Sequence, residues 1–203
     1  LKLYRKFGKE MLGMLNGMFA FALWDENNSE LLLARDKSGK KPLYFTEQAG
    51  RLGFASELKA LFNLPWVRKE LDSKILYDFL TYDLVPPPNT MFKGIFKFKP
   101  GHFMRIGMKG VIEYKPYYEL KRKKLEFSNE EGLADLVFNS FDKSVKDRMI
   151  SDVPVGAFLS GGVDSSAVVA LMRKNTEKNI KTFTIGFEGQ PRYDELEHAK
   201  KVS

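Results

Sequence analysis

Short apolar runs separated by polar turns fill the first part of the chain. Met18–Asp25 is an apolar run rich in aromatic residues, and Glu30–Ala34 is a second one. Because Asn-Asn-Ser at 27–29 is a turn signal, the two runs are predicted to form a β-hairpin. Two more strands are predicted at Leu43–Phe45 and Leu52–Ala55, so this region is expected to be rich in sheet.

The periodicity then becomes helical for two short segments. Ser56 is expected to cap a helix over Glu57–Phe62, and Asp72 is expected to cap a second helix that runs through Leu80. Residues 85–90 (VPPPNT) follow, and three successive prolines exclude a helix and disfavour a central strand. This segment is predicted to be a rigid connector.

A long helical pattern begins near residue 128. Ser128 followed by Glu131 fits a capping box, in which the serine is the N-cap and the glutamate lies three residues on. An apolar stripe then continues to about Met149. We therefore predict a domain boundary near residue 125, with one domain over 1–125 and a second over 126–203.

The second domain contains the segment with the most distinctive chemistry. Val153–Leu159 is predicted to be a strand buried on both faces, and a tight polar turn over 160–166 leads into a helical run at Ala167–Met172. Ile180–Phe187 is the expected position of a second, parallel strand. Together they predict the strand–turn–helix–strand unit of an α/β sheet.

The turn between strand and helix has the features of an anion-binding loop. Gly161 and Gly162 allow close approach of the backbone, while the first N–H groups of the helix and its dipole favour negative charge. Three serines, Ser160, Ser165 and Ser166, add hydroxyl donors. A phosphate or pyrophosphate fits such a loop, whereas the alternative is a plain helix start capped by Asp164 or Ser165.

Asp164 adds a second element to this loop. A carboxylate repels phosphate unless a cation lies between them, so Asp164 indicates Mg²⁺. The spacing excludes three other motifs: no lysine follows Gly162 as a Walker A loop requires, Phe158 replaces the first glycine of a nucleophile elbow, and no Gly-x-Gly-x-x-Gly is present.

The ends of the two predicted strands would form one wall of a pocket. Ligands of open α/β sheets bind beyond the carboxyl ends of the strands. Leu159 ends the first strand, and Ile185 to Phe187 end the second, so these residues are candidates to hold a nucleotide base. The alternative is that they are ordinary core residues.

Composition narrows the possible chemistry. The 203 residues contain no cysteine, which excludes a thiol nucleophile or thiolate metal site within them, and the two histidines, His102 and His198, lie far apart. No apolar run reaches the length of a membrane span, and the start of the chain has no signal-peptide pattern, so a cytoplasmic location is expected.

The net charge of +7 is concentrated in one segment. Between residues 91 and 124 there are ten Lys/Arg and two Glu, over a predicted hairpin of Ile95–Ile106 and Val111–Tyr118. Phe96, Phe98 and Phe103 alternate there with basic residues. Such alternation fits a strand with one buried and one solvated face, and also a nucleic-acid-binding surface on which bases stack.

At this point the motifs resemble a known family. Ser160–Ser165 (SGGVDS) matches the SGGxDS loop of ATP pyrophosphatases, which also occurs in GMP synthetases, NAD synthetases and tRNA-thiolating enzymes. Upstream segments are similar to the latter half of a class II glutamine amidotransferase domain: LNGMFAFALWD at 15–25, ARDKSGKKPLY at 34–44 and ASELKAL at 55–61. In this order the set resembles the glutamine-hydrolysing asparagine synthetase family.

That resemblance implies a fold and a reaction. It implies a four-layer αββα fold of the N-terminal-nucleophile hydrolase type, followed by a doubly wound α/β domain, both incomplete here. It implies that ATP and Mg²⁺ activate aspartate as an adenylate, that pyrophosphate leaves, and that ammonia from glutamine attacks. The implied pyrophosphate ligands are Ser160, Gly161, Gly162, Asp164 and Ser165, and the implied adenosine contacts are Leu159 and Ile185.

Departures from the family limit what this chain is expected to do alone. The family's glutaminase nucleophile is an amino-terminal cysteine, which is absent, so no catalytic residue is assigned. We expect an internal piece of a longer enzyme that is inactive by itself, with glutamine, aspartate and ATP as substrates and a homodimer as an open option. A β-lactam-synthetase-like cyclase and a basic nucleic-acid-binding module remain as alternatives, although no nucleic acid is expected.

Overall fold

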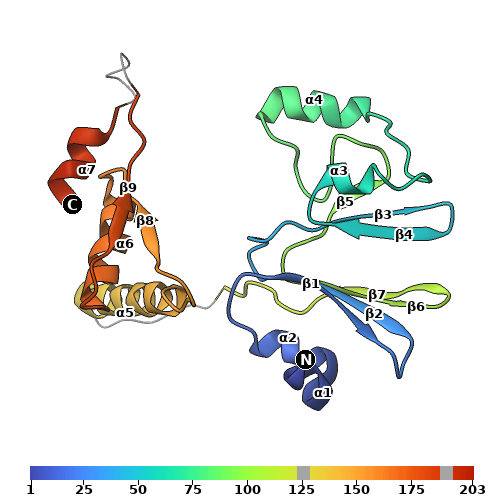
Figure 1. The fold of residues 1–203 in the computed structure, drawn as a ribbon, viewed down its shortest axis with the longest axis horizontal. Helices are drawn as coiled ribbons and strands as arrows, with labels where there is room; N and C mark the ends of the chain where they lie inside the picture. The colour runs from blue at the N-terminus through green and yellow to red at the C-terminus, as the bar shows by residue number, and fades with distance from the viewer. Residues whose placement is uncertain (123–128, 188–193) are drawn as a thin grey trace. The chain divides into compact units, whose positions relative to one another are not determined.

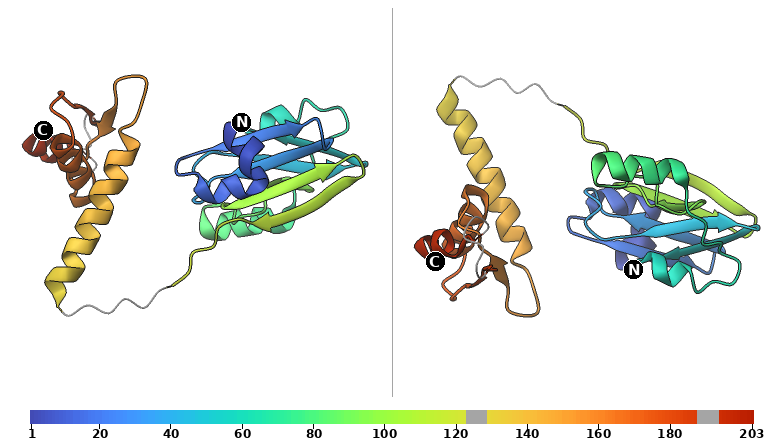
Figure 2. Two further views of the ribbon diagram at one scale, coloured as in Figure 1. Left: turned by 90° about the horizontal axis from the view of Figure 1, so that it is seen from below. Right: turned by 90° about the horizontal axis from the view of Figure 1, so that it is seen from above.

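The computed structural model describes residues 1–122, 129–187 and 194–203. The chain divides into two compact units, Leu1–Arg122 and Lys123–Ser203, which are described separately below (Figures 1 and 2). The predicted boundary near residue 125 lies outside the described residues. Within the described ranges, no helix is long and apolar enough to cross a membrane.

Two antiparallel sheets form the centre of the first unit. The larger sheet has the strand order β1-β2-β6-β7, and the smaller has the order β4-β3-β5. Their strands are β1 (Ala20–Asp25), β2 (Glu30–Arg35), β3 (Tyr44–Gln48), β4 (Arg51–Ala55), β5 (Ile95–Lys97), β6 (His102–Gly107) and β7 (Gly110–Pro116). The predicted hairpin of β1 and β2 is confirmed, with Ala20 opposite Arg35 and Asp25 opposite Glu30.

Helices cover the outer faces of the two sheets. On one side lie α1 (Lys2–Phe7), the short 3₁₀ helix η1 (Gly8–Glu10) and α2 (Met11–Met14); on the other lie α3 (Leu58–Leu61) and α4 (Ser73–Tyr82) (Figure 1). On β2, Leu32 and Ala34 pack with Met11 and Leu12 of α2, while Leu33 between them faces Phe98 and the second sheet. A third cluster, Leu61, Val67 and Ile95, joins α3 to the smaller sheet. The predicted αββα layering is confirmed.

The predicted strand Ile95–Ile106 is wrong as a single element. Residues 98–101 separate β5 from β6, and the two strands belong to different sheets. Pro100 has no N–H to donate to a ladder, and Gly101 has a φ of +64°, which favours glycine. A Cβ at Gly101 would also lie 2.9 Å from the Tyr118 carbonyl oxygen. The chain therefore leaves one sheet and enters the other here.

The predicted helix caps had mixed outcomes. Asp72 caps α4 as predicted, because its side chain accepts a hydrogen bond from the Lys74 N–H at 3.0 Å. Ser56 does not cap α3; Glu57 occupies the N-cap with an extended backbone and no side-chain bond. The N-cap of α5 (Glu130–Arg148) is Asn129, whose side chain accepts from the Gly132 N–H at 2.9 Å. Ser128 lies outside the described residues.

The second unit contains a parallel pair of strands. The elements are α5, β8 (Gly156–Phe158), α6 (Val163–Lys174), β9 (Lys181–Phe183) and α7 (Leu196–Val202). β8 pairs with β9 in parallel, with Phe158 opposite Phe183, so the repeating unit of a doubly wound sheet is confirmed. Val145 of α5 packs with Leu171 and Met172 of α6.

The predicted strand Val153–Leu159 is shorter and more open than expected. Only residues 156–158 are in β8, since Pro154 interrupts the run before them. Phe158 is 78% exposed and Val153 is 69% exposed, so the strand is not buried on both faces. The sheet that contains β8 has two strands among the described residues, which leaves part of its surface uncovered.

The basic segment 91–124 does not present a base-stacking face. Phe98 and Phe103 are buried in the two cores of the first unit, so these rings cannot stack on bases. Arg105 pairs with Glu30 at 2.7 Å, and Glu113 is surrounded by cations. The aromatic alternation in this segment thus reflects one buried face of a strand.

Glu113 is the centre of that charge cluster. Its carboxylate lies 3.0 Å from the Lys9 ammonium, 3.1 Å from the Lys115 ammonium and 3.4 Å from the Arg105 guanidinium. The hydrogen bond from Lys9 is the largest of the effects that lower the pKa of Glu113 to about 2, and it outweighs the opposing effect of burial. The cluster ties the amino-terminal helices to β7.

A buried carboxylate organises the crossing from the first sheet to the second. Asp36 is 1% exposed, and its carboxylate accepts hydrogen bonds from the backbone N–H groups of Phe19, Ser38, Lys40 and Lys41 at 2.9–3.3 Å. Burial opposes ionisation of Asp36, but these four donors outweigh it and hold its pKa below the ordinary value. The neighbouring Arg35 guanidinium donates to the carbonyls of Gly39, Lys41 and Phe98.

We expect Asp36→Asn to destabilise the first unit by about 2 kcal/mol, because an amide cannot accept four N–H donors and leaves some of them buried without partners. Urea unfolding followed by Trp fluorescence would measure this. The matched control is Glu26→Gln on an exposed turn, which should change stability by less than about 0.5 kcal/mol. Equal effects of the two substitutions would contradict the role given to Asp36.

The depressed pKa of Glu113 predicts acid sensitivity. A carboxyl whose pKa is lowered on folding contributes stability that is fully present above its ordinary value of 4.5 and is lost as the pH falls toward about 2. The unfolding midpoint of the protein should therefore fall across this window. In Glu113→Gln the fall should be shallower, as measured by thermal unfolding from pH 6 to pH 2.5. An identical pH profile in the two proteins would refute the assignment.

Candidate nucleotide-binding site

The end of β8 is held by hydrogen bonds to β9. The Leu159 N–H donates to the Phe183 carbonyl at 2.9 Å, and the Thr184 hydroxyl donates to the Leu159 carbonyl at 2.7 Å. Leu159 is 2% exposed. These two bonds fix the start of the loop against the neighbouring strand. Thr184, which directly precedes Ile185, was not among the residues predicted from the sequence.

Two serines close the loop on itself. The hydroxyls of Ser160 and Ser165 lie 3.0 Å apart, and the Ser160 N–H donates to the Ser165 hydroxyl at 3.3 Å. The Ser165 hydroxyl also donates to the Gly162 carbonyl at 3.2 Å. Gly161, between them, has a φ of +82°, a conformation that favours glycine. These contacts hold residues 160–165 in one tight turn.

The start of α6 lies directly after this turn. Gly162 is the N-cap and no side chain caps the helix, so the alternative of a helix capped by Asp164 or Ser165 is wrong. The first bond of the helix runs from the Ser166 N–H to the Gly162 carbonyl at 3.0 Å. By helix geometry, the N–H groups of residues 163–165 have no acceptor within the helix, and they add to the positive end of its dipole. This end can bind an anion.

The fit of a metal ion rests on Asp164 alone. Asp164 lies in the first turn of α6 with its side chain exposed. In the described part of the chain, no three His, Cys, Asp or Glu residues gather as a metal cluster. A single carboxylate beside an anion-binding turn fits Mg²⁺, which is commonly held by one or two carboxylates together with substrate phosphates and water.

The predicted strand Ile180–Phe187 is wrong in its length, because β9 covers only Lys181–Phe183. Leu159 directly follows β8 and Ile185 lies two residues beyond β9, and the two differ in exposure. The Leu159 side chain lies in the interior, whereas Ile185 is 67% exposed. Ile185 is therefore the member of the pair whose side chain is open to a ligand. A wall for a nucleotide base at this edge would be formed by Ile185 and by main-chain groups near Leu159.

The Ser166 hydroxyl does not take part in the hydrogen bonds that join Ser160 and Ser165. Its hydroxyl is buried and has no hydrogen-bond partner among the described residues. It lines a cavity of about 410 Å³ between α6, β9 and the end of α7, together with residues such as Arg173, Thr182 and Val202. The structure thus brings Ser160 and Ser165 together and directs Ser166 elsewhere.

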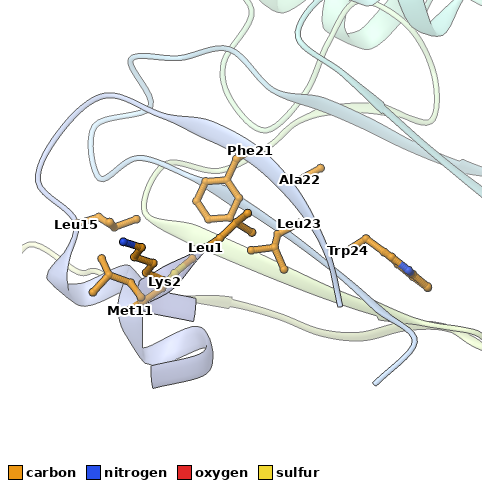
Figure 3. A pocket seen from close by; sticks show the side chains of 9 residues that line it. Leu1, Lys2, Met11, Leu15, Phe21, Ala22, Leu23 and Trp24 are labelled. Atoms are coloured by element: carbon orange, nitrogen blue, oxygen red, sulfur yellow. The ribbon is translucent and has the colours of Figure 1, made fainter. Parts of the chain in front are cut away.

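A larger cavity of about 650 Å³ lies in the first unit beside the edge strand β1. Figure 3 shows Phe21 and Leu23 of this strand near Met11 and Leu15 of the amino-terminal segment. Its lining is mostly apolar, and Lys2 is its one ionisable side chain. The cavity therefore lacks the converging polar groups that a catalytic site needs.

With this geometry in place, comparison with known proteins gives the family. Residues 1–118 match the model of the glutamine amidotransferase domain, and residues 137–203 match the model of asparagine synthase. The chain therefore belongs to the glutamine amidotransferase family, in the form that continues into an asparagine synthase domain. The resemblance predicted from the sequence motifs is confirmed.

Individual relatives match over the whole chain. It is 37% identical over 203 residues to asparagine synthetase [glutamine-hydrolyzing] 1 of Bacillus subtilis, covering 32% of that protein. It is 34% identical over 215 residues to a putative asparagine synthetase of Methanocaldococcus jannaschii and 32% identical over 219 residues to amidase chyE of Penicillium rubens, covering 39% and 32% of them. The chain spans about a third of the length of these relatives.

The chain is also similar to a solved structure, a glutamine phosphoribosylpyrophosphate amidotransferase from B. subtilis complexed with ADP and GMP. The sequence identity is 17%, and the match covers 93% of this chain and 37% of that one. The TM-score is 0.35.

The different contacts of Ser165 and Ser166 predict different effects of their removal. Ser165→Ala deletes the partner of both the Ser160 N–H and the Ser160 hydroxyl, so hydrogen exchange of the Ser160 amide should become faster. Ser166→Ala removes a buried hydroxyl without a partner and should leave that exchange rate unchanged. Nuclear magnetic resonance would measure both rates, and equal rates would contradict the loop geometry described here.

Proposed function

We propose that this chain is part of an ATP-dependent amide-forming ligase, a glutamine-hydrolysing asparagine synthase. In this proposal, residues 1–125 belong to the glutaminase domain and residues 126–203 begin the synthetase domain. The aspartate side chain attacks the α-phosphorus of ATP and pyrophosphate leaves, giving an aspartyl adenylate. Ammonia then attacks the acyl carbon, AMP leaves with the bonding electrons, and a proton is released as asparagine forms.

The observation that carries this proposal is the loop 160–165. It joins the carboxyl end of a parallel strand to an uncapped helix start, and it lies within the segment that matches the asparagine synthase model. Backbone N–H groups, two serine hydroxyls and a helix dipole converge there. This combination supports the binding of a pyrophosphate group.

The roles of individual residues follow from this geometry. Gly161, Gly162 and the first turn of α6 would bind the β- and γ-phosphates, with the hydroxyls of Ser160 and Ser165 as further donors. Asp164 would hold Mg²⁺, which would supply the charge neutralisation that a polyphosphate leaving group needs. Ile185, with main-chain groups near Leu159, would contact the adenosine, while the Ser166 hydroxyl, which lines the separate cavity, would make no contact with the phosphates.

Much of the rate enhancement in this proposal comes from positioning. A loop fixed at Leu159 and closed by Ser165 holds the leaving pyrophosphate in place without reorganisation during the reaction. The first domain would supply ammonia, but no cysteine is present among the 203 residues. We therefore propose that the chain by itself neither hydrolyses glutamine nor makes asparagine. A cytoplasmic location and a homodimer stay predictions.

The test is aspartate-dependent exchange of radiolabelled pyrophosphate into ATP, measured in the full-length protein. Asp164→Asn should reduce this exchange about a hundredfold or more, because the metal loses its protein carboxylate. The matched control is Asp135→Asn on the exposed surface of α5, which should retain full exchange. A full-length enzyme that exchanges pyrophosphate equally well with Asp164→Asn would overturn the role of this residue.

The acceptor is tested in the same assay. Replacing aspartate by other carboxylic amino acids should abolish exchange if the proposal is correct. Exchange that requires a different amino-acid derivative, with an internal amine as nucleophile, would instead indicate a cyclase that uses the same adenylate chemistry. No exchange with any carboxylate would remove the ligase assignment.

A further inference from the structure

The last helix of the described chain, α7, lies directly against the phosphate-binding loop. A Cβ built on Gly161 would lie 2.4 Å from the carbonyl carbon of His198 and 2.6 Å from the Ala199 nitrogen. No side chain fits at this distance, so the backbone of α7 rests on the bare Cα of Gly161. Ala199, whose backbone nitrogen takes part in this contact, is 4% exposed, so its side chain has little free space around it.

The same helix makes a second contact of this kind with the other wall of the site. A Cβ on Gly186 would lie 2.4 Å from Cδ1 and 2.9 Å from Cγ of Leu196. Gly186 directly follows Ile185, the exposed residue two positions beyond the end of β9. Figure 1 shows α7 beside α6 and the two strands of this unit. One helix thus contacts both the loop after β8 and the segment after β9.

We infer that Ala199 and Leu196 are positioning residues for ATP, which set the separation between the phosphate-binding loop and the adenosine wall. This inference rests on the proposed function. The two walls follow different strands, and the hydrogen bonds at Leu159 fix only the start of the loop. The tip of the loop at Gly161 is held from outside by the backbone of α7, through a contact that leaves no room for a side chain at position 161.

The physical consequence is a site whose width depends on one packing contact. A larger side chain at position 199 would have to be accommodated by moving α7 or the loop, since buried positions have no spare volume. Movement of the loop changes the distance between the phosphate and adenosine subsites. Removal of the Leu196 side chain deletes volume instead of adding it, and it leaves the segment after β9 without the side chain that packs against Gly186.

The experiment uses the full-length protein and Mg·ATP as the probe. Ala199→Leu should raise the Kd for Mg·ATP, measured by titration calorimetry, and the KM for ATP by about tenfold, while kcat changes much less. Leu196→Ala adds no volume and should weaken ATP binding in the same direction. The matched control is Ala134→Leu, which adds the same three carbons at an exposed position on α5 and should leave Kd and KM unchanged.

The outcomes separate this inference from the proposed function. Weaker ATP binding in Ala199→Leu and Leu196→Ala, with thermal unfolding midpoints like that of Ala134→Leu, supports the inference. If Ala199→Leu does not fold, the Leu196→Ala measurement decides. Unchanged ATP binding in Leu196→Ala, alongside impaired pyrophosphate exchange in Asp164→Asn, overturns the inference and leaves the function standing. Failure of the unmodified protein to bind Mg·ATP overturns both.

Discussion

The chain must pass from one sheet to another without leaving backbone groups unpaired, and the first unit depends on how Asp36 and Arg35 meet this requirement. The Asp36 carboxylate accepts hydrogen bonds from three N–H groups of the turn and from the N–H of Phe19 before β1. The Arg35 guanidinium donates to three carbonyls, one of them that of Phe98, where the chain passes between the sheets. Buried polar groups of the backbone need partners. Two adjacent side chains of opposite charge therefore replace the regular ladder where it has to stop.

The second unit solves a related problem in the opposite way. After β8, no side chain caps the N–H groups at the start of α6. The hydroxyls of Ser160 and Ser165 close the turn before it. Unpaired N–H groups that would be a fault in a core are useful at an edge where an anion can bind them. The turn at Asp36 has its N–H groups paired with a carboxylate, whereas the helix start after Gly161 has N–H groups without acceptors. This difference distinguishes a structural turn from a candidate binding site.

Local signals were enough to predict much of this architecture. Two apolar runs separated by a turn signal predicted β1 and β2, Asp72 predicted the start of α4, and the glycines of the SGGVDS loop predicted the turn before α6. The failures came from contacts distant in sequence. Pro100 and Gly101 mark a break within Ile95–Ile106, but the assignment of its two strands to different sheets depends on distant pairing partners. The enclosure of Gly161 by α7 likewise depends on residues almost forty positions away.

The proposed recognition of phosphate by main-chain N–H groups of the loop would also bear on how the family diversifies. Amide N–H groups are the same in every residue except proline, so a polyphosphate held by them places few demands on side-chain identity. Relatives named as synthetases and as amidases align with this chain along its full length. A phosphate-binding loop of this kind can be inherited without change, while the residues that select the acceptor change elsewhere in the polypeptide.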